Sequence, residues 1–131
     1  MAEDLKAIIT VPTYWTFPEG EGGRERVSYD HPTPLDREGT LVRLLESLRE
    51  LRGSDFGVFV IAATAAPELE AAAEGKVEEL ISPFRGAFPI ACFGAEDLAF
   101  LEERLQELGF AQRFFSLQGY GDVRNLQLVI A

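Results

Sequence analysis

The stretch FGVFVIAAT, residues 56–64, constrains the fold of this chain more than any other part of the sequence. It is a continuous apolar run that contains no charged residue. Strands that read as uninterrupted apolar runs are typical of parallel sheets, because helices cover both faces of such a sheet. We therefore predict a buried strand here, with helices on both sides of it.

Three other segments predict strands. Residues 5–11, LKAIITV, form a short apolar run that ends at Pro12, and residues 88–93, FPIACF, form another. The segment RFFSL, at about 113–117, is expected to add a short fourth strand. Bulky and β-branched residues fit the pleated surface of a sheet, whereas proline and glycine mark where such runs stop. The chain is therefore expected to carry about four strands.

Helical segments separate these strands. Thr33 and Pro34 suit the start of a first helix that ends before Gly53. Further helices are predicted from about Pro67 to Ile81, over about 95–108, and after Asp122. Apolar residues at helical spacing are expected to face inward on the first, third and last of these helices: Leu41, Leu44, Leu45, Leu48 and Leu51; Leu98, Leu101, Leu105 and Leu108; Val123, Leu126 and Ile130.

The alternation of strands and helices indicates the fold class. Buried strands that alternate with amphipathic helices predict a mostly parallel sheet of about four strands between two helical layers. We therefore expect a Rossmann-like three-layer α/β/α fold. The chain has 131 residues, which suits a single domain over 1–131 with a core that needs no disulfide.

The charge of the chain excludes several kinds of partner. The net charge of −10 argues against nucleic-acid binding, which depends on Lys and Arg that neutralise phosphates.

The single cysteine, Cys92, forms no internal disulfide and is expected to be a small core residue. The acidic start of the chain does not resemble a signal peptide, and no stretch reaches the roughly 18 apolar residues of a membrane segment. We therefore expect a cytoplasmic protein.

The expected sheet also predicts where a ligand would bind. In open parallel sheets, ligands bind beyond the carboxyl ends of the strands. The residues at those ends are Pro12, Thr13 and Tyr14 after the first strand and Thr64 after the second. The stretch after Phe93 and residues 119–125 complete the edge.

The pair Arg124-Asn125 has two interpretations. Gly119 and Gly121 allow a tight turn, and Asp122 is expected to cap the last helix, which puts the pair in its first turn. An arginine there is either part of a surface ion pair, or it stacks on a base or clamps a phosphate.

Other candidate motifs favour structural roles. The stretch EGEGG, residues 19–23, is glycine-rich, but it does not open a helix, and Glu19 and Glu21 would repel phosphate. It is expected to be a flexible loop. His31 is the only histidine, and it is expected to hold the loop before the first helix, although Asp30 and His31 as a base with its orienting acid is an alternative. The glutamates of the helices are expected to form a solvated surface.

Three stretches together resemble a known enzyme family. The segments IITVPTYW, GTLVRLLESL and GYGDVRNLQLVIA are similar to the N-terminal half of inverting family 2 glycosyltransferases. Those enzymes have a GT-A fold and use nucleotide-sugar donors. Their first strand ends in Pro-Thr-Tyr-Asn, where this chain has Trp15 in place of Asn. A later helix opens with Arg-Asn-X-Gly, where this chain has Gln127 in place of Gly.

The resemblance implies roles for six residues. Pro12, Thr13 and Tyr14 would lie against the nucleotide, with Thr13 and Tyr14 at the base or ribose. Arg124, next to Asn125, would help to hold the base and the diphosphate. Thr64 stands near the place where the family has an Asp that reads uracil. These six residues form the predicted nucleotide site.

The resemblance also implies a metal site that this sequence does not carry. In the family, the helix after Arg-Asn leads into a strand whose Asp-X-Asp binds Mg or Mn on the diphosphate, and the catalytic base lies further on. The sequence contains no Asp-X-Asp. No metal ligand or catalytic residue is therefore assigned, no cofactor is expected, and the chain is interpreted as a truncated domain that is inactive in glycosyl transfer on its own.

Two functions follow from these observations. The first is a glycosyltransferase-like domain that binds a nucleotide or nucleotide sugar weakly. The alternative is a non-catalytic, Rossmann-like interaction module that dimerises through its exposed C-terminal edge. The apolar end Leu128-Val129-Ile130-Ala131 supports this alternative, because it is expected to seek cover.

Overall fold

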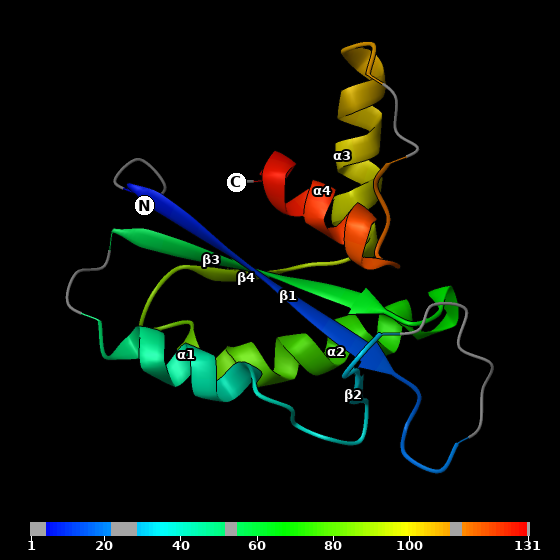
Figure 1. Cartoon of the computed structure of the whole chain (residues 1–131). Coiled ribbons are helices and arrows are strands. Elements are labelled where there is room, and N and C mark those ends of the chain that lie inside the picture. The colour runs from blue at the N-terminus through cyan, green and yellow to red at the C-terminus, as the bar shows by residue number, and fades with distance from the viewer. Residues whose placement is uncertain (1–4, 22–28, 52–54, 111–113, 131) are drawn as a thin grey trace.

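The computed structural model describes residues 5–21, 29–51, 55–110 and 114–130 (Figure 1). Along these ranges the chain forms β1 (Ala7–Thr16), β2 (Thr33–Pro34), α1 (Leu41–Arg49), β3 (Phe56–Thr64), α2 (Glu70–Ile81), β4 (Ile90–Phe93), α3 (Ala95–Glu107) and α4 (Tyr120–Ile130). Short 3₁₀ turns, Pro67–Leu69 and Ser82–Phe84, flank α2. None of the helices in these ranges is long and apolar enough to cross a membrane.

Some predicted features lie outside the described residues. They are Gly22 and Gly23 of the EGEGG loop, the helix stop at Gly53, Arg113 of the predicted fourth strand, and Ala131.

The four strands form one open sheet in which every pair of neighbours is parallel. Their order is β2-β1-β3-β4. Strand β3 pairs with β1 along its whole length, from Phe56 beside Ala7 to Thr64 beside Trp15. It pairs with β4 on its other side. The predicted α/β class with a parallel sheet of about four strands is therefore confirmed.

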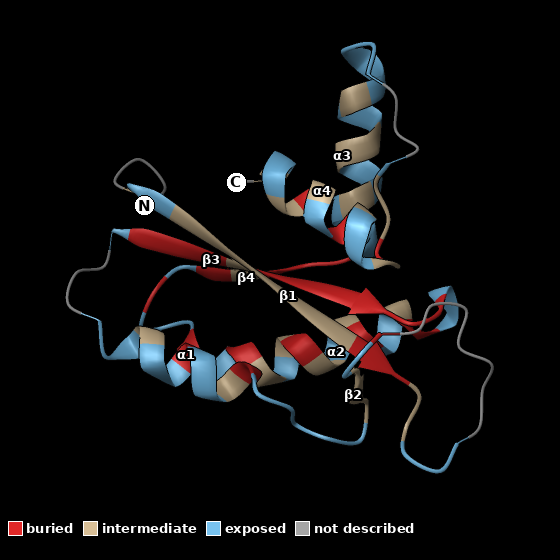
Figure 2. Ribbon diagram, in the orientation of Figure 1, coloured by how far each residue is buried: buried red, intermediate tan, exposed pale blue. Residues whose placement is uncertain are grey.

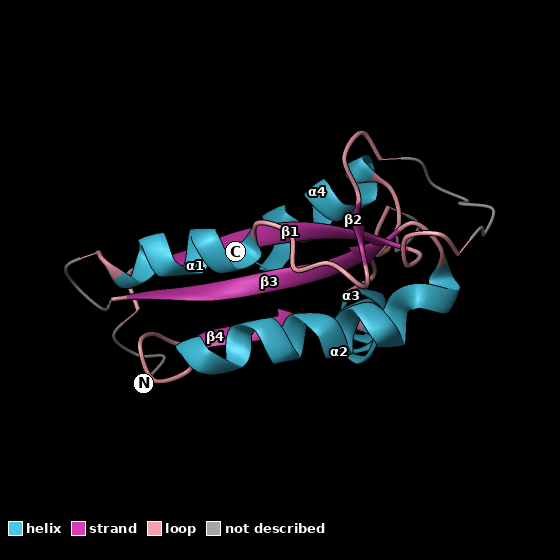
Figure 3. Ribbon diagram, turned by 90° about the horizontal axis from the view of Figure 1, so that it is seen from below, coloured by secondary structure: helices cyan, strands magenta, loops and turns pink. Residues whose placement is uncertain are grey.

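Helices lie on both faces of the sheet. In Figure 1, α1 and α2 lie below the strands and α4 lies above them; Figure 3, seen from below, draws α1 and α2 in front of the strands. Alternate side chains of β3 reach the two faces, so that Val60 packs with α1 and α2, whereas Ile61 packs with α4. Each fully buried Val or Ile contributes about 1.5–3 kcal/mol to stability. The run FGVFVIAAT is apolar throughout because it supplies both cores.

Helix α3 differs from its prediction. It projects away from the sheet in Figure 1, and Figure 2 shows no buried residue on it. Leu98 and Leu101, near its start, pack partly against the α4 side of the core, but Leu108 is 58% exposed. The predicted inward stripe is therefore wrong toward the end of the helix, because only its first turns reach the core.

Strand β1 continues through Pro12, whereas the sequence predicted that it would stop there. The Trp15 carbonyl accepts the Ala65 N–H at 2.9 Å on the β3 side, and the Thr16 carbonyl accepts the Leu35 N–H at 3.1 Å on the β2 side. Backbone groups alternate along a strand, so the even-numbered residues of β1 face away from β3. Pro12 is one of them, and its missing N–H costs no hydrogen bond to β3.

The first helix is shorter than predicted. Thr33 and Pro34 do not begin it, because they form β2, which pairs with Trp15 and Thr16 of β1. Gly39 has a φ of +72°, so the backbone turns there before α1 begins at Leu41.

The helical spacing of the leucines predicted the helix correctly, and Leu41 and Leu45 are buried. Leu44 and Leu51, however, are 40% and 55% exposed, so the predicted inward stripe is only partly correct. The spacing also did not show that Gly39 interrupts the segment.

The last part of the chain also differs from the prediction. Residues 114–117 form no strand, although the Leu117 carbonyl accepts the Thr64 N–H at 2.8 Å. The fourth strand of the sheet is β2 instead. Helix α4 begins at Tyr120, so Asp122 lies in its first turn and does not cap it. The predicted stripe is correct: Val123 and Leu126 are fully buried and Ile130 packs against them.

Two glycines should respond to alanine in opposite ways. A methyl group on Gly39 would lie 3.0 Å from Thr33 Cγ2 in a left-handed backbone, so Gly39→Ala should lower the free energy of unfolding by about 1–2 kcal/mol. Gly75 lies inside α2 with nothing within 4 Å of the added methyl, so Gly75→Ala should raise it by about 0.5–1 kcal/mol. Urea unfolding measures both values. Equal effects at the two positions would contradict this view of the turn before α1.

Candidate functional site

The carboxyl ends of β1 and β3 meet at one edge of the sheet, which we call the carboxyl edge. Trp15 and Thr64, near the ends of the two strands, are direct neighbours. The turn at 117–119 lies at the same edge, because the Leu117 carbonyl accepts the Thr64 N–H. Segments from distant parts of the sequence therefore converge at the place where open parallel sheets bind ligands.

A pocket of about 230 Å³ lies beside the last part of β1. We call it the β1 pocket. Its walls come from β1, from the segment before and after β2, and from the start of α1. The lining residues are Val11, Pro12, Thr13, Tyr14, Trp15, His31, Thr33, Glu38, Gly39, Thr40, Leu41 and Leu44. Three predicted nucleotide contacts, Pro12, Thr13 and Tyr14, thus line one pocket.

The Thr13 hydroxyl is engaged within the protein. It donates to the Ile61 carbonyl at 2.8 Å and accepts the indole N–H of Trp15 at 2.8 Å. Thr13 therefore anchors the wall of the pocket and holds the ring of Trp15.

The start of α1 contributes partial positive charge to the same pocket. No side chain caps the helix at Thr40, and its first turn contains no acidic residue. The first N–H groups of a helix lack partners within the helix and carry partial positive charge. Glu38 lines the pocket too, so its negative charge offsets the partial positive charge of the start of α1.

His31 was assigned a loop role from the sequence, but it lines the β1 pocket. It precedes β2, and the pairing of β2 with β1 brings it there. A lone histidine in a loop gives no signal of this, because its position depends on a two-residue strand.

Three tyrosines pack against one another at the carboxyl edge. The ring centroids of Tyr14, Tyr29 and Tyr120 are separated by 4.7–4.8 Å in each pair, with tilted or edge-to-face geometry. We call this group the tyrosine cluster. Such contacts add about 0.5–1.5 kcal/mol per pair beyond the area that they bury. Only Tyr14 of the three was predicted from the sequence as a site residue.

The Tyr29 hydroxyl joins two segments of the carboxyl edge. It donates to the Thr64 carbonyl at 3.0 Å and accepts the Gly119 N–H at 2.9 Å. Burial raises the pKa of Tyr29, and the hydrogen bond from Gly119 opposes this rise. The phenol is therefore protonated and able to donate at neutral pH.

Thr64, another predicted contact, has a structural role. Its side chain is fully buried, donates to the Ala66 carbonyl at 2.9 Å and accepts from Gln118 at 2.9 Å. Gln118 also donates to Glu70 at 2.9 Å. The structure thus places the Thr64 hydroxyl in an internal network that connects β3, α2 and the turn before α4.

Arg124 and Asn125 have different surroundings. Asn125 donates to the Phe114 carbonyl at 2.9 Å and so holds the segment before α4. Arg124 is exposed and lies near the tyrosine cluster. Burial and then the Tyr120 phenol raise the pKa of Tyr14, and the guanidinium of Arg124 lowers it. The structure therefore places Arg124 near enough to Tyr14 to affect its pKa, whereas the side chain of Asn125 is engaged with the Phe114 carbonyl.

A second group of ionisable side chains lies at the start of α3. The Ala95 N–H donates to Glu74, and Asp97 accepts the Gly94 N–H at 2.9 Å. Burial raises the pKa of Glu74, and Asp97 raises it further by charge repulsion.

Burial also raises the pKa of Cys92 to about 12, so its thiol stays protonated, in keeping with the predicted core role.

Across the described ranges, no three His, Cys, Asp or Glu side chains are grouped as a metal site requires. Comparison of the chain with models of protein families, with curated proteins and with solved structures finds no match.

The raised pKa of Glu74 predicts how stability depends on pH. The folded chain holds the proton of Glu74 above its ordinary pKa of 4.5, so this carboxyl stabilises the fold at low pH. That contribution is lost as the pH rises through the folded pKa. The free energy of unfolding of the natural chain relative to Glu74→Gln should therefore fall as the pH rises above about 4.5.

Urea unfolding at several pH values between 4 and 7 measures this difference. Glu103→Gln, at an exposed position on α3, is the matched control and should give a smaller change with pH. A natural chain and a Glu74→Gln variant with parallel pH profiles would contradict the assignment.

Proposed function

We propose that this chain is a nucleotide-binding module of the glycosyltransferase type, which holds the nucleoside diphosphate part of a nucleotide sugar at the carboxyl edge. The observation that supports this most is the β1 pocket beside the tyrosine cluster. It lies at the carboxyl end of β1, where the next segment of chain returns to one side of β1 while β3 lies on the other. A divergence of this kind opens a crevice for ligands in α/β sheets.

The tyrosine cluster suits the base of a nucleotide, and the β1 pocket suits its diphosphate. Tyrosine rings and an exposed arginine are surfaces on which a base stacks. The start of α1, with its uncapped N–H groups, favours an anionic group in the neighbouring pocket. Glu38 in the same pocket opposes an anion, so weak binding is expected.

The proposed module binds its ligand without transferring a sugar. The resemblance to family 2 glycosyltransferases places the metal ligands in an Asp-X-Asp, and the sequence contains none. The GT-A identity of the fold is part of this proposal, and it rests on the resemblance of three stretches of sequence.

Titration with UDP and GDP tests the proposed function. We expect saturable binding with a dissociation constant near the millimolar range, which corresponds to about −4 kcal/mol. Arg124→Ala should weaken it about tenfold, the size of one charge-assisted contact. Arg104→Ala, which removes an exposed arginine from α3, is the matched control and should leave binding unchanged. Absence of binding to the natural chain, or equal loss in both variants, would reject the proposal.

A non-catalytic interaction module is the second candidate, and exposed apolar side chains favour it. Leu128 and Val129 on α4 are 76% and 43% exposed. Exposed apolar groups of this size are typical of surfaces that contact another protein.

Light scattering over a range of protein concentrations tests this second candidate. If the C-terminal edge dimerises, the mass should rise with concentration, and Leu128→Lys should abolish the rise. Phe100→Lys is the matched control, because it adds the same charge to an equally exposed position on another helix. A monomer at every concentration, or loss of the dimer with Phe100→Lys alone, would contradict dimerisation through this edge.

A further inference from the structure

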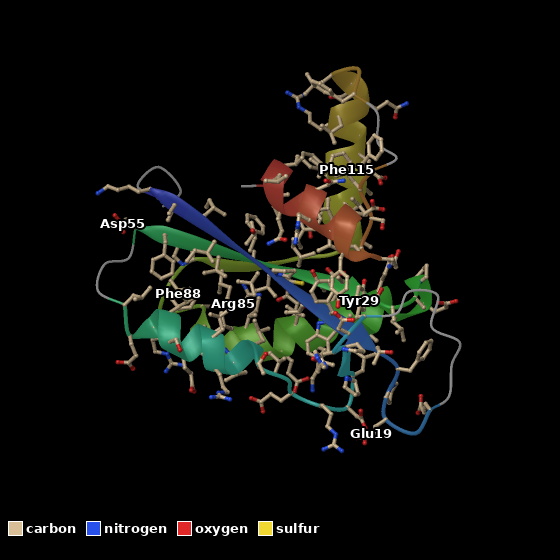
Figure 4. All side chains as sticks on the ribbon, viewed as in Figure 1. Glu19, Tyr29, Asp55, Arg85, Phe88 and Phe115 are labelled. Carbon is tan, nitrogen blue, oxygen red and sulfur yellow. The ribbon has the colours of Figure 1, made fainter. Side chains whose placement is uncertain are left out.

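Tyr29 is a buried residue at the carboxyl edge, and the residues that follow it directly are exposed. The side chain is 5% exposed, whereas the next two residues, Asp30 and His31, are exposed. Figure 4 shows it between the end of β1 and α4. Tyr29 belongs to no helix or strand, so its place depends on the contacts of its side chain and on the Asp30 N–H, which donates to the Tyr120 hydroxyl at 2.9 Å.

The contacts of Tyr29 are those of a ligand in a binding slot. Its ring lies against the rings of Tyr14 and Tyr120, with centroids at 4.7 and 4.8 Å. Its hydroxyl meets one acceptor, the Thr64 carbonyl, and one donor, the Gly119 N–H. The walls come from β1, the end of β3 and the start of α4, and they do not require Tyr29 to complete any element.

The slot fits any planar ring that presents an acceptor next to a donor. The phenol hydroxyl serves as both at a single atom. Uracil offers the same pair as adjacent atoms, with a ring carbonyl for the Gly119 N–H and a ring N–H for the Thr64 carbonyl. Tyr14 and Tyr120 would pack against such a ring as they pack against Tyr29.

We propose that Tyr29 is a displaceable internal plug, and that a planar ring with adjacent acceptor and donor groups binds this chain by taking its place. Where this builds on the proposed function, the incoming ring is the base of the nucleotide. Displacement reduces the affinity of the natural chain for any such ring, because only the fraction of molecules with an open slot can bind. Removal of the plug should therefore strengthen binding.

The slot itself is tested without any nucleotide. Tyr29→Ala removes the phenol and should bind p-cresol, which replaces the lost ring and hydroxyl. Thermal unfolding should show that p-cresol raises the midpoint of Tyr29→Ala more than toluene does, since toluene lacks the hydroxyl. Phe88→Ala is the matched control, because Phe88 is also an aromatic residue 5% exposed but lies in the apolar core beside Phe56 and Phe84. It should show no preference for p-cresol.

Displacement by a base is tested with uracil as the probe. Both Tyr29→Ala and Tyr29→Phe should bind uracil at least tenfold more tightly than the natural chain does, because the phenylalanine plug lacks both hydrogen bonds. Tyr29→Phe keeps the ring, so it also serves if Tyr29→Ala does not fold. Uracil affinity equal to or below that of the natural chain in the folded variants, together with no preference for p-cresol, would overturn the proposal.

The two proposals fail in distinguishable ways. Tighter binding of uracil to Tyr29→Ala and Tyr29→Phe, with no binding of UDP to any variant, would support the plug and reject the nucleotide. Binding of UDP to the natural chain, with Tyr29→Phe no tighter and no preference for p-cresol, would reject the plug and support the nucleotide.

Discussion

The parallel pairing of β1 with β3 is the constraint on which the rest of the structure depends. It extends from Ala7 beside Phe56 to Trp15 beside Thr64, and it joins segments about fifty residues apart in sequence. Because the two strands run in the same direction, their carboxyl ends meet at one edge. The β1 pocket, the tyrosine cluster and the internal network around Thr64 all lie at that edge.

The pairing also assigns every side chain of the two strands to a face. Trp15 and Val60 belong to the core beneath α1 and α2, whereas Tyr14 and Ile61 belong to the core beneath α4. Adjacent residues at the end of β1 thus serve different regions, so that Thr13 holds the wall of the pocket while Tyr14 supports the aromatic cluster.

The parts of the fold that the sequence predicted correctly are those with strong local patterns. The apolar run of β3, the apolar stripe of α4 and the presence of helices α1 and α2 depend on nearby residues alone. The errors occurred where the answer depends on distant contacts. Pro12 is accommodated because its nitrogen faces away from β3, and Thr33 and Pro34 become a strand because β1 offers them an edge. Gly39 interrupts a pattern that otherwise reads as one helix.

The residues of the candidate site also fall into those that local sequence predicted and those that distant contacts determine. Thr13, Tyr14 and Arg124 were expected at the carboxyl edge, because they follow or adjoin predicted elements. Tyr29 and His31 were not assigned to it, since their positions depend on contacts such as that between Tyr29 and Gly119, ninety positions apart. Thr64 and Asn125 lie near the edge but are occupied by internal hydrogen bonds, and only the folded chain reveals such partners.

The Pro12 nitrogen faces the outer side of β1, and this affects how one molecule of this chain can associate with another. Beyond the short pairing with β2, the described residues place no strand on the outer side of β1. A bare strand edge is a template on which other chains add strands and sheets grow into aggregates. Pro12 removes a donor from that template, and Gln127 of α4 reaches the Thr10 carbonyl at 3.4 Å. These two features make the edge a poor template for polymerisation.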